Sequence, residues 1–438
     1  MTTARTSARP GAAHRLAALA EGALGGPLPV RLRTWDGSET GPPDAPALVV
    51  RSRRALRRLL WEPGELGLAQ AYVTGELEVE GDLVAALRAM WAAARERGLH
   101  APRPSLADRA RAVGHAVRLG ALGPRPPAPG SQARLRGGLH SKARDRAAIS
   151  HHYDLSGDFY RLLLDETMAY SCGYWPGEDP EAAPAVAQRA KLELICRKLG
   201  LLPGARLLDI GCGWGSLTLY AAEQHKAQVT AVTLAREQAA CVRRQVRERQ
   251  LEHRVEVVCQ DYRDIEGAGH DAVATVEMGE HVGDAEYPAF AAALHRLVRP
   301  KGRVLVQQMS RGTRAPGGGA FIEAYIAPDM HMRPMGETAG LLEAAGLEVR
   351  SVESMREHYV RTIAAWHRTL EERWEEVVRT VGAQRARVWR LYLAGGALAF
   401  EERRMGVDQF LCVRPTADGV SGLTGSEAAG WYRNLEGR

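Results

Sequence analysis

Three glycines at alternate positions, preceded by a carboxylate, are the residues of this 438-residue chain best suited to hold a ligand. Gly211, Gly213 and Gly215 follow the apolar run LLDI, which predicts a buried strand, and precede SLTLYAAEQ, which predicts a helix. Glycine lets the backbone turn sharply and approach a ligand without a Cβ in the way. A dinucleotide site has the spacing G-x-G-x-x-G, but Ser216 stands where its last glycine should be. Asp209 places a carboxylate just before this loop, where it can reach a cationic amino group of the ligand.

Polar residues also follow the next predicted strands. QVTAVTLAREQ predicts a second strand that ends at Thr233 and Leu234, and RVEVVCQDYRDI a third that ends at Gln260 and Asp261. HDAVATVEMGEHVG and KGRVLVQQMS predict a fourth and a fifth strand. Because ligands bind outside the carboxyl ends of parallel strands, we expect the first pair beside a ribose and the second beside an adenine. The alternative, that these polar residues only cap strands and helices, requires several strand ends to coincide by chance.

This arrangement resembles the cofactor domain of class I methyltransferases, which bind S-adenosylmethionine (SAM). Further segments are similar to those of the cyclopropane-fatty-acid synthase family, which includes the mycolic acid cyclopropane synthases: HHYDLSGDFYRLLLDETMAYSCGYW, TLAREQ, GEHVG and REHYVRTIAAW. The resemblance covers roughly residues 60–412 and implies an α/β fold, a Rossmann-like class I methyltransferase domain with a smaller N-terminal domain. With Asp209, the residues implied to bind SAM are Tyr170, Ser171, Gly211, Gly213, Thr233, Leu234, Gln238, Gln260 and Asp261.

The resemblance also implies a bicarbonate ion beside the reacting carbons. Its matching ligands here are Cys172, Glu280 and Tyr359, which we therefore expect to be catalytic. Gln307 stands where the family has a bicarbonate-binding histidine. An amide can still donate a hydrogen bond, but it carries neither a proton to transfer nor a positive charge.

The chemistry of the implied reaction needs these residue types. An alkene is a poor nucleophile, so the sulfonium methyl must be held against it in a dry pocket. Methyl transfer leaves a carbocation one carbon away, which a nearby negative charge stabilises. A base must then remove a proton. Bicarbonate held by Cys172, Glu280 and Tyr359 could perform both tasks.

The segment after the fifth strand departs from typical cyclopropane synthases. It reads YIAPDMHMRPMGET, and together with Gln307 and Glu277 it is more similar to the actinobacterial branch that makes 10-methylene acyl chains, precursors of 10-methylstearate (tuberculostearic acid). The expected substrate is an oleoyl-type acyl chain on a membrane phospholipid, and a cyclopropane product is the alternative. A methylene product needs a separate reductase as a partner.

Length and composition predict two domains. We expect an N-terminal unit at residues 1–120 for lipid docking or dimerisation, a basic linker rich in Pro and Gly at 121–150, and the methyltransferase domain at 151–438. Leu56, Leu59 and Leu60 alternate with arginines, so this helix either lies on anionic headgroups or packs on its own domain. The net charge of +6 and the pI near 9.1 suit nucleic acid or an anionic membrane surface, and a generally Arg-rich proteome explains them equally well.

The remaining patterns narrow the class of protein. The six cysteines form no C-x-x-C pair and complete no zinc spacing, so we expect no metal and a reducing cytoplasm, with the protein peripheral to the membrane. Aromatic content of 6% gives little support for a nucleic-acid modifier, and no nucleic-acid partner is expected. Two rival functions are a methyltransferase for a soluble metabolite and a non-catalytic lipid-binding module. Cys172 argues against the first, and the intact loop of Asp209 and Gly211 argues against the second.

Overall fold

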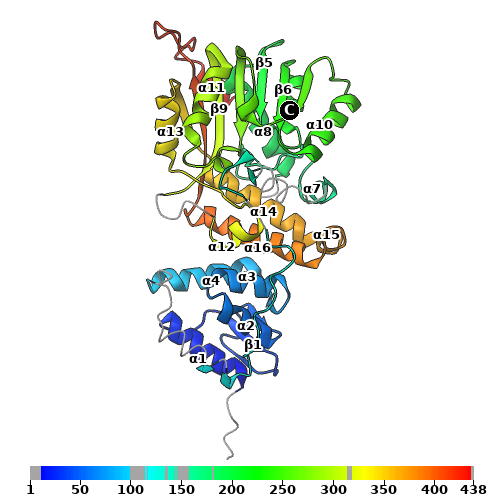
Figure 1. Cartoon of the computed structure of the whole chain (residues 1–438), viewed down its shortest axis with the longest axis vertical. Helices are drawn as coiled ribbons and strands as arrows, with labels where there is room; N and C mark the ends of the chain where they lie inside the picture. Colours follow the sequence, from blue (N-terminus) through cyan, green and yellow to red (C-terminus); the bar gives the residue numbers. More distant parts are fainter. Residues whose placement is uncertain are drawn as a thin grey trace, which may run out of the picture. The chain divides into compact units, whose positions relative to one another are not determined.

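The computed structural model in Figure 1 describes residues 11–98, 114–115, 117–133, 137–142, 144–145, 157–179, 182–312 and 318–435. The HHYDLS part of the first family motif lies outside these residues. The chain forms two compact units, the first being Met1–Gln132 with Gly382–Leu398, and the second Ala133–Val381 with Ala399–Arg438. The first unit therefore takes in residues 121–132, which the sequence assigns to the linker, and a segment that it assigns to the methyltransferase domain.

The second unit is built on a seven-stranded sheet with the order β10-β11-β9-β8-β5-β6-β7. Strands β5 to β9 run parallel to one another, and β11 is antiparallel to both β9 and β10. All five predicted strands are present and the Rossmann-like fold is confirmed. The strand bounds are β5 Arg206–Ile210, β6 Gln228–Thr233, β7 Val255–Cys259, β8 His270–Val276, β9 Val298–Ser310, β10 Glu348–Ser354 and β11 Gly406–Val413.

Helices cover both faces of this sheet (Figure 1). Leu207 belongs to a core with α8 (Pro184–Leu199), α9 (Ser216–Gln224) and α10 (Arg236–Glu248), and its neighbour Leu208 to a core with α11 (Tyr287–Leu297) and α13 (Met335–Ala344). Successive strand residues point to opposite faces, so a strand buried on both sides reads as a continuous apolar run. The other helices of this unit are α7 Gly157–Leu163, η1 Tyr262–Asp264, η2 Gly279–His281, α12 Ala320–Tyr325, α14 Arg356–Glu372, α15 Trp374–Val381 and α17 Ala428–Trp431.

The first unit is a smaller α/β domain with a four-stranded sheet in the order β2-β1-β3-β4. Residues Gly382–Leu398, which include most of α16 (Ala383–Glu401), complete it, because Ala394 packs with Tyr72 and Leu83 in one apolar cluster. The other bounds are α1 Ala12–Leu24, β1 Arg31–Thr34, β2 Glu39–Thr40, β3 Ala47–Val50, α2 Arg53–Trp61, α3 Glu65–Val73, β4 Leu77–Glu80 and α4 Leu83–Glu96.

The arginines of α2 are largely engaged within the first unit. Arg58 is 2% exposed and donates to Glu76 at 2.8 Å and to the Pro127 carbonyl at 2.9 Å. Arg57 donates to the carbonyls of Ala121 and Leu122 at 3.3 and 3.0 Å. The helix therefore packs on its own domain, which is one of the two arrangements expected for it. Within the part of the chain that the structure describes, no helix is both long enough and apolar enough to span a bilayer.

Candidate active site

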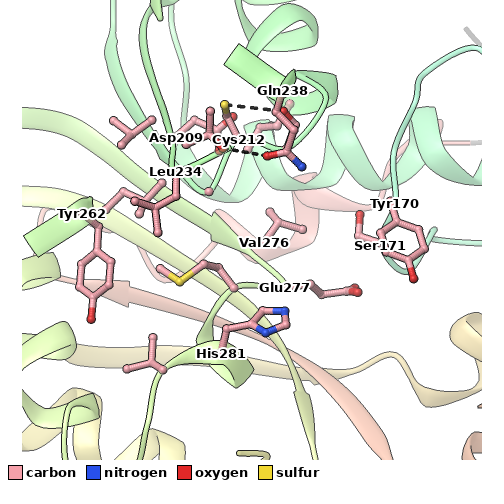
Figure 2. Close-up of a pocket in the computed structure, with 18 of the residues that line it drawn as sticks. Tyr170, Ser171, Asp209, Cys212, Leu234, Gln238, Tyr262, Val276, Glu277 and His281 are labelled. Carbon is pink, nitrogen blue, oxygen red and sulfur yellow. Dashed lines mark hydrogen bonds between the residues drawn. The ribbon is translucent and has the colours of Figure 1, made fainter. Parts of the chain in front are cut away.

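One pocket opens at the carboxyl ends of β5, β6 and β8. It brings together the predicted cofactor residues except Asp261: Tyr170, Ser171, Asp209, Gly211, Gly213, Thr233, Leu234, Gln238 and Gln260. Figure 2 shows Tyr262 and Leu234 toward one end of the pocket and Tyr170 and Ser171 toward the other, with Val276 and Glu277 between them. This is the edge where a parallel sheet binds its ligand.

The glycine loop has the conformation that its residue types predict. Gly211 and Gly213 have φ angles of 79° and 54°, a region that glycine adopts without steric cost. A Cβ on Gly211 would lie 3.1 Å from the Met278 side chain, whereas one on Gly213 would meet nothing within 4 Å. The loop thus leaves open space beside its backbone, as a bound nucleoside requires.

Asp209 is buried below this loop and lines the pocket. Its Oδ2 accepts a hydrogen bond of 2.6 Å from the Thr218 hydroxyl. Burial raises the pKa of Asp209 to about 6, and the Thr218 hydrogen bond and the nearby Lys191 charge oppose that shift. A carboxylate in this position fits the cationic amino end of SAM, and the residues present therefore fit the cofactor.

Asp261 has a different position from the one expected. Its carboxylate is 3% exposed and accepts from the Arg263 guanidinium at 2.8 and 2.6 Å. Arg263 lines the pocket and also donates to Asp145 at 3.0 Å, with His140 beside it in the pocket wall. Asp261 therefore orients an arginine at the pocket, and sequence reasoning did not identify that arginine.

The centre of the site is the carboxylate of Glu277, which follows directly after β8 and lines the pocket. Its Oε1 accepts from the backbone N–H of Cys172 at 2.7 Å and from the Gln307 side-chain amide at 2.8 Å. Its Oε2 accepts from the Tyr359 hydroxyl at 2.6 Å. Glu277 has a φ of 52°, unusual for a residue other than glycine, so its backbone is held in the left-handed region at the pocket.

Three of the four predicted catalytic residues thus meet around Glu277. Cys172 contributes its backbone N–H, while its fully buried thiol donates to the carbonyls of Gly173 and Met355. Burial and the charge of Glu277 raise the pKa of this thiol well above its usual value, so the thiol stays protonated.

Glu280, the fourth predicted catalytic residue, is fully buried but does not line the pocket. Among the described residues, neither of its carboxylate oxygens has a hydrogen-bond partner of ordinary geometry. Burial and the nearby Glu277 raise its pKa well above the usual value, although the backbone near Glu280 and Met309 opposes the shift. Glu277 has three well-placed donors, so of this pair Glu277 carries the negative charge and Glu280 is neutral.

Lys191 supplies a positive charge to the same pocket. It extends from α8, is 1% exposed, and donates to the Ser171 hydroxyl at 2.8 Å. Burial lowers its pKa, and the carboxylates of Glu277 and Asp209 oppose that shift. His281 also lines the pocket, where burial lowers its pKa to about 4 and keeps the imidazole neutral near pH 7.

The expected bicarbonate does not fit this arrangement as predicted. The donors that would hold it, the Cys172 N–H, the Tyr359 hydroxyl and the Gln307 amide, all bind the Glu277 carboxylate. Glu277 itself brings a carboxylate to this position. The signal for Glu277 was present in the sequence, because an ionisable residue directly follows the apolar run AVATV.

Comparisons with known proteins agree with this geometry. The family model of mycolic acid cyclopropane synthetase matches residues 140–410. The chain belongs to this family. It is a class I SAM-dependent methyltransferase, as its family and the SAM-binding fold of its structural neighbours show.

Relatives of the family resemble most of the chain. The probable fatty acid methyltransferase Rv3720 of Mycobacterium tuberculosis is 36% identical over 91% of this chain and 94% of that protein. The tuberculostearic acid methyltransferase UfaA1 of the same organism is 32% identical over 88% of each chain. The solved structure of the mycolic acid cyclopropane synthase CmaA1 with SAH and CTAB is 30% identical with a TM-score of 0.57, over 61% of this chain and 97% of that one.

The raised pKa of Asp209 predicts a pH dependence of SAM binding. The ionised carboxylate attracts the SAM ammonium, and with a pKa of about 6 its ionised fraction falls as the pH drops from 7 to 5. We expect the dissociation constant for SAM, measured by isothermal titration calorimetry, to rise about tenfold over that range. The matched control is Asp209→Asn, which should bind SAM more weakly at pH 7 and lose this pH dependence. An equally steep dependence in Asp209→Asn would contradict the assignment.

Proposed function

We propose that the enzyme transfers the SAM methyl carbon to the double bond of an unsaturated, oleoyl-type acyl chain on a phospholipid, and that the product is a 10-methylene acyl chain. Relatives named for fatty acid and tuberculostearic acid methyltransferases cover 88% or more of the chain and support the acyl substrate. The cyclopropane-fatty-acyl-phospholipid synthase of Escherichia coli, 32% identical over 64% of this chain, supports the phospholipid. A cyclopropane product is the alternative outcome on the same substrate.

The observation that carries this proposal is the half-buried carboxylate of Glu277, which lines the pocket. A methyltransferase acting on oxygen or nitrogen needs a base only at the heteroatom, whereas an alkene produces a carbocation that requires both a negative charge and a base. Glu277 offers both functions from one carboxylate, with three hydrogen bonds that keep it in place.

When bound, SAM supplies an electrophilic methyl group on a sulfonium. The double bond of the acyl chain would form a carbon–carbon bond to that methyl as the methyl–sulfur bond breaks. S-adenosylhomocysteine would be the leaving group, and a cation would remain on the neighbouring carbon of the acyl chain. The negative charge of Glu277 stabilises this cation. A hydride then moves from the methylated carbon to the cation, and Glu277 accepts a proton from the new methyl group. The electron pair of that C–H bond forms the carbon–carbon double bond of the methylene branch.

The two products differ only in the last steps. If Glu277 removes the methyl proton before the hydride moves, ring closure gives cyclopropane instead. A methylene product requires a base that acts late, and a carboxylate held by a neutral amide, Gln307, is such a base in this proposal. Reduction of the methylene to a methyl branch would then fall to a separate reductase.

Mass spectrometry tests the reaction class. Incubation with SAM and oleoyl phospholipid vesicles should give acyl chains heavier by one CH₂ unit. NMR of the product should show a methylene branch, a C=CH₂ group, on the acyl chain. Glu277→Gln keeps the shape of the side chain but removes the base, and we expect kcat to fall by roughly 10²- to 10⁴-fold. Calorimetry should show that SAM still binds this variant. Full activity of Glu277→Gln would refute its role, and absence of the mass shift in the wild type would favour a soluble substrate.

The product ratio tests the role of Gln307. Gln307→His introduces an imidazole next to Glu277, a second base that can take the methyl proton before the hydride moves. We expect the cyclopropane fraction to rise, measured by NMR of the acyl chains after equal turnover. An unchanged ratio would show that this position does not select the product.

We further propose that the first unit docks on an anionic bilayer. Trp61 and Leu122 are each 52% exposed and lie close together, because the Trp61 indole N–H donates to the Gly123 carbonyl at 3.2 Å and Arg57 binds the Leu122 carbonyl. Arg118 is exposed near them. An exposed tryptophan and leucine among arginines suit the boundary between headgroups and acyl chains.

Vesicle binding tests this surface. The double variant Trp61→Ala/Leu122→Ser should bind oleoyl phosphatidylglycerol vesicles at least tenfold more weakly in co-sedimentation, since it removes two apolar side chains from the bilayer boundary. Leu202→Ser in the second unit, where Leu202 is 71% exposed, is the matched control and should bind like the wild type. Equal binding of the double variant and this control would exclude the surface.

A further inference from the structure

A continuous series of side-chain hydrogen bonds leads from Glu277 to the protein surface. The Gln307 amide N–H donates to Glu277 at 2.8 Å, and the Gln307 carbonyl accepts from the Gln409 amide N–H at 2.8 Å. The Gln409 carbonyl accepts from the Lys198 ammonium at 2.8 Å. Lys198 also binds Glu353, which accepts from the Tyr432 hydroxyl at 3.1 Å.

These residues come from separate elements of the second unit. Gln307 lies on β9, Gln409 opposite it on the antiparallel β11, Lys198 on α8 and Glu353 on β10. Gln307, Gln409 and Lys198 are at most 1% exposed. A buried polar side chain without a partner destabilises the fold, so each of the three is constrained to keep its hydrogen bonds.

Lys198 fixes the direction of the series from the end opposite the Glu277 carboxylate. An ammonium group can only donate, so the Gln409 group that faces it must be the carbonyl. The N–H of Gln409 then faces Gln307, whose carbonyl must turn toward it. The N–H of Gln307 is thereby left facing Glu277. Without this constraint, the Gln307 amide could rotate by half a turn and present its carbonyl oxygen to the Glu277 carboxylate.

We propose that Lys198 and Gln409 are positioning residues that fix the orientation of the Gln307 amide, so that it always donates to Glu277. They touch neither the cofactor pocket nor the reacting atoms. Lys198 acts on Glu277 through the side-chain amides of Gln409 and Gln307, which lie on the adjacent strands β11 and β9. The effect on catalysis rests on the proposed function of Glu277 as the base, but the orientation itself does not.

The series transmits orientation and not protons. An amide has no proton that it can release and regain near neutral pH, so two consecutive glutamines interrupt any proton relay. Their dipoles instead align with the positive charge of Lys198 and direct the N–H end at Glu277. Glu353 supports this arrangement, because its negative charge opposes the lowering of the Lys198 pKa by burial.

Several other groups influence the charge of Glu277, and the test must leave them unchanged. They are Lys191 from α8, Tyr359 from α14, Glu280 from η2 and the Cys172 thiol, and His281 from η2 lines the same pocket. None of them forms a hydrogen bond with Gln409 among the described residues. Substitutions at Gln409 therefore change the orientation of Gln307 while these groups stay in place.

Two substitutions of nearly the same size at Gln409 separate orientation from packing. In Gln409→Glu, the carboxylate still accepts from Lys198 but has no N–H for Gln307, whose amide should then turn its carbonyl toward Glu277. In Gln409→Met, neither hydrogen bond remains and the Gln307 amide is free to take both orientations. Losing a donor raises the pKa of a carboxylate, so the base becomes active only at higher pH.

We expect the acid limb of the kcat–pH profile to move up by about one pH unit in Gln409→Glu, and by less in Gln409→Met. Near the wild-type midpoint this corresponds to roughly a tenfold loss for Gln409→Glu, recovered at higher pH. The SAM dissociation constant should be unchanged in both. Lys198→Met should shift the kcat–pH profile as Gln409→Met does. Lys198→Arg should keep the wild-type profile, because arginine also can only donate.

A uniform loss at every pH, or the same profile in all variants, would overturn the proposal. If Gln409→Glu does not fold by circular dichroism, the comparison of Lys198→Met with Lys198→Arg decides the question. Infrared titration of the carboxylates, with Glu277→Gln to identify the Glu277 signal, gives its pKa without turnover. A wild type that makes no product would therefore refute the proposed function, whereas an unmoved Glu277 signal in Gln409→Glu would refute this inference.

Discussion

The rest of the site depends on the three hydrogen bonds that the half-buried Glu277 carboxylate accepts. An anion removed from water destabilises a protein by several kcal/mol unless donors replace its hydration. Here the replacement comes from three places distant in sequence: a backbone N–H at Cys172, a hydroxyl at Tyr359 and an amide at Gln307. Each of them is fixed by a different element, so the carboxylate can be held only when the whole second unit has folded.

The sheet explains how these distant groups meet. Strands β8 and β9 are parallel neighbours, and Val276, the last residue of β8, pairs with Gln307. The next residue, Glu277, therefore emerges beside the Gln307 side chain. The antiparallel strand β11 then pairs Gln409 with Gln307. A parallel strand in its place would pair residues in a different register. The antiparallel strand β11, added to an otherwise parallel sheet, thus helps to position the Gln307 side chain at the site.

The sequence predicted the part of the site that depends on local patterns. Glycines at the end of an apolar strand and polar residues after the following strands identified the cofactor pocket, because strand ends of a parallel sheet share one edge. It could not predict which donors face which acceptor. Asp261 binds Arg263 instead of lining the pocket, and the Glu280 carboxylate neither lines the pocket nor has a hydrogen-bond partner of ordinary geometry among the described residues. The contribution of residues 382–398 to the first unit depends on long-range packing that no local pattern encodes.

Two carboxylates three residues apart show why environment decides the role of a side chain. Glu277 and Glu280 have the same intrinsic acidity, but Glu280 is fully buried and Glu277 half-buried, and only Glu277 receives well-formed hydrogen bonds and lines the pocket. Two adjacent carboxylates cannot both be ionised at low cost, so the charge resides where the donors are. Lys191 adds a positive charge on the same side of the pocket. A carboxylate built into the chain also needs no anion from solution, so its occupancy of the site follows from folding alone.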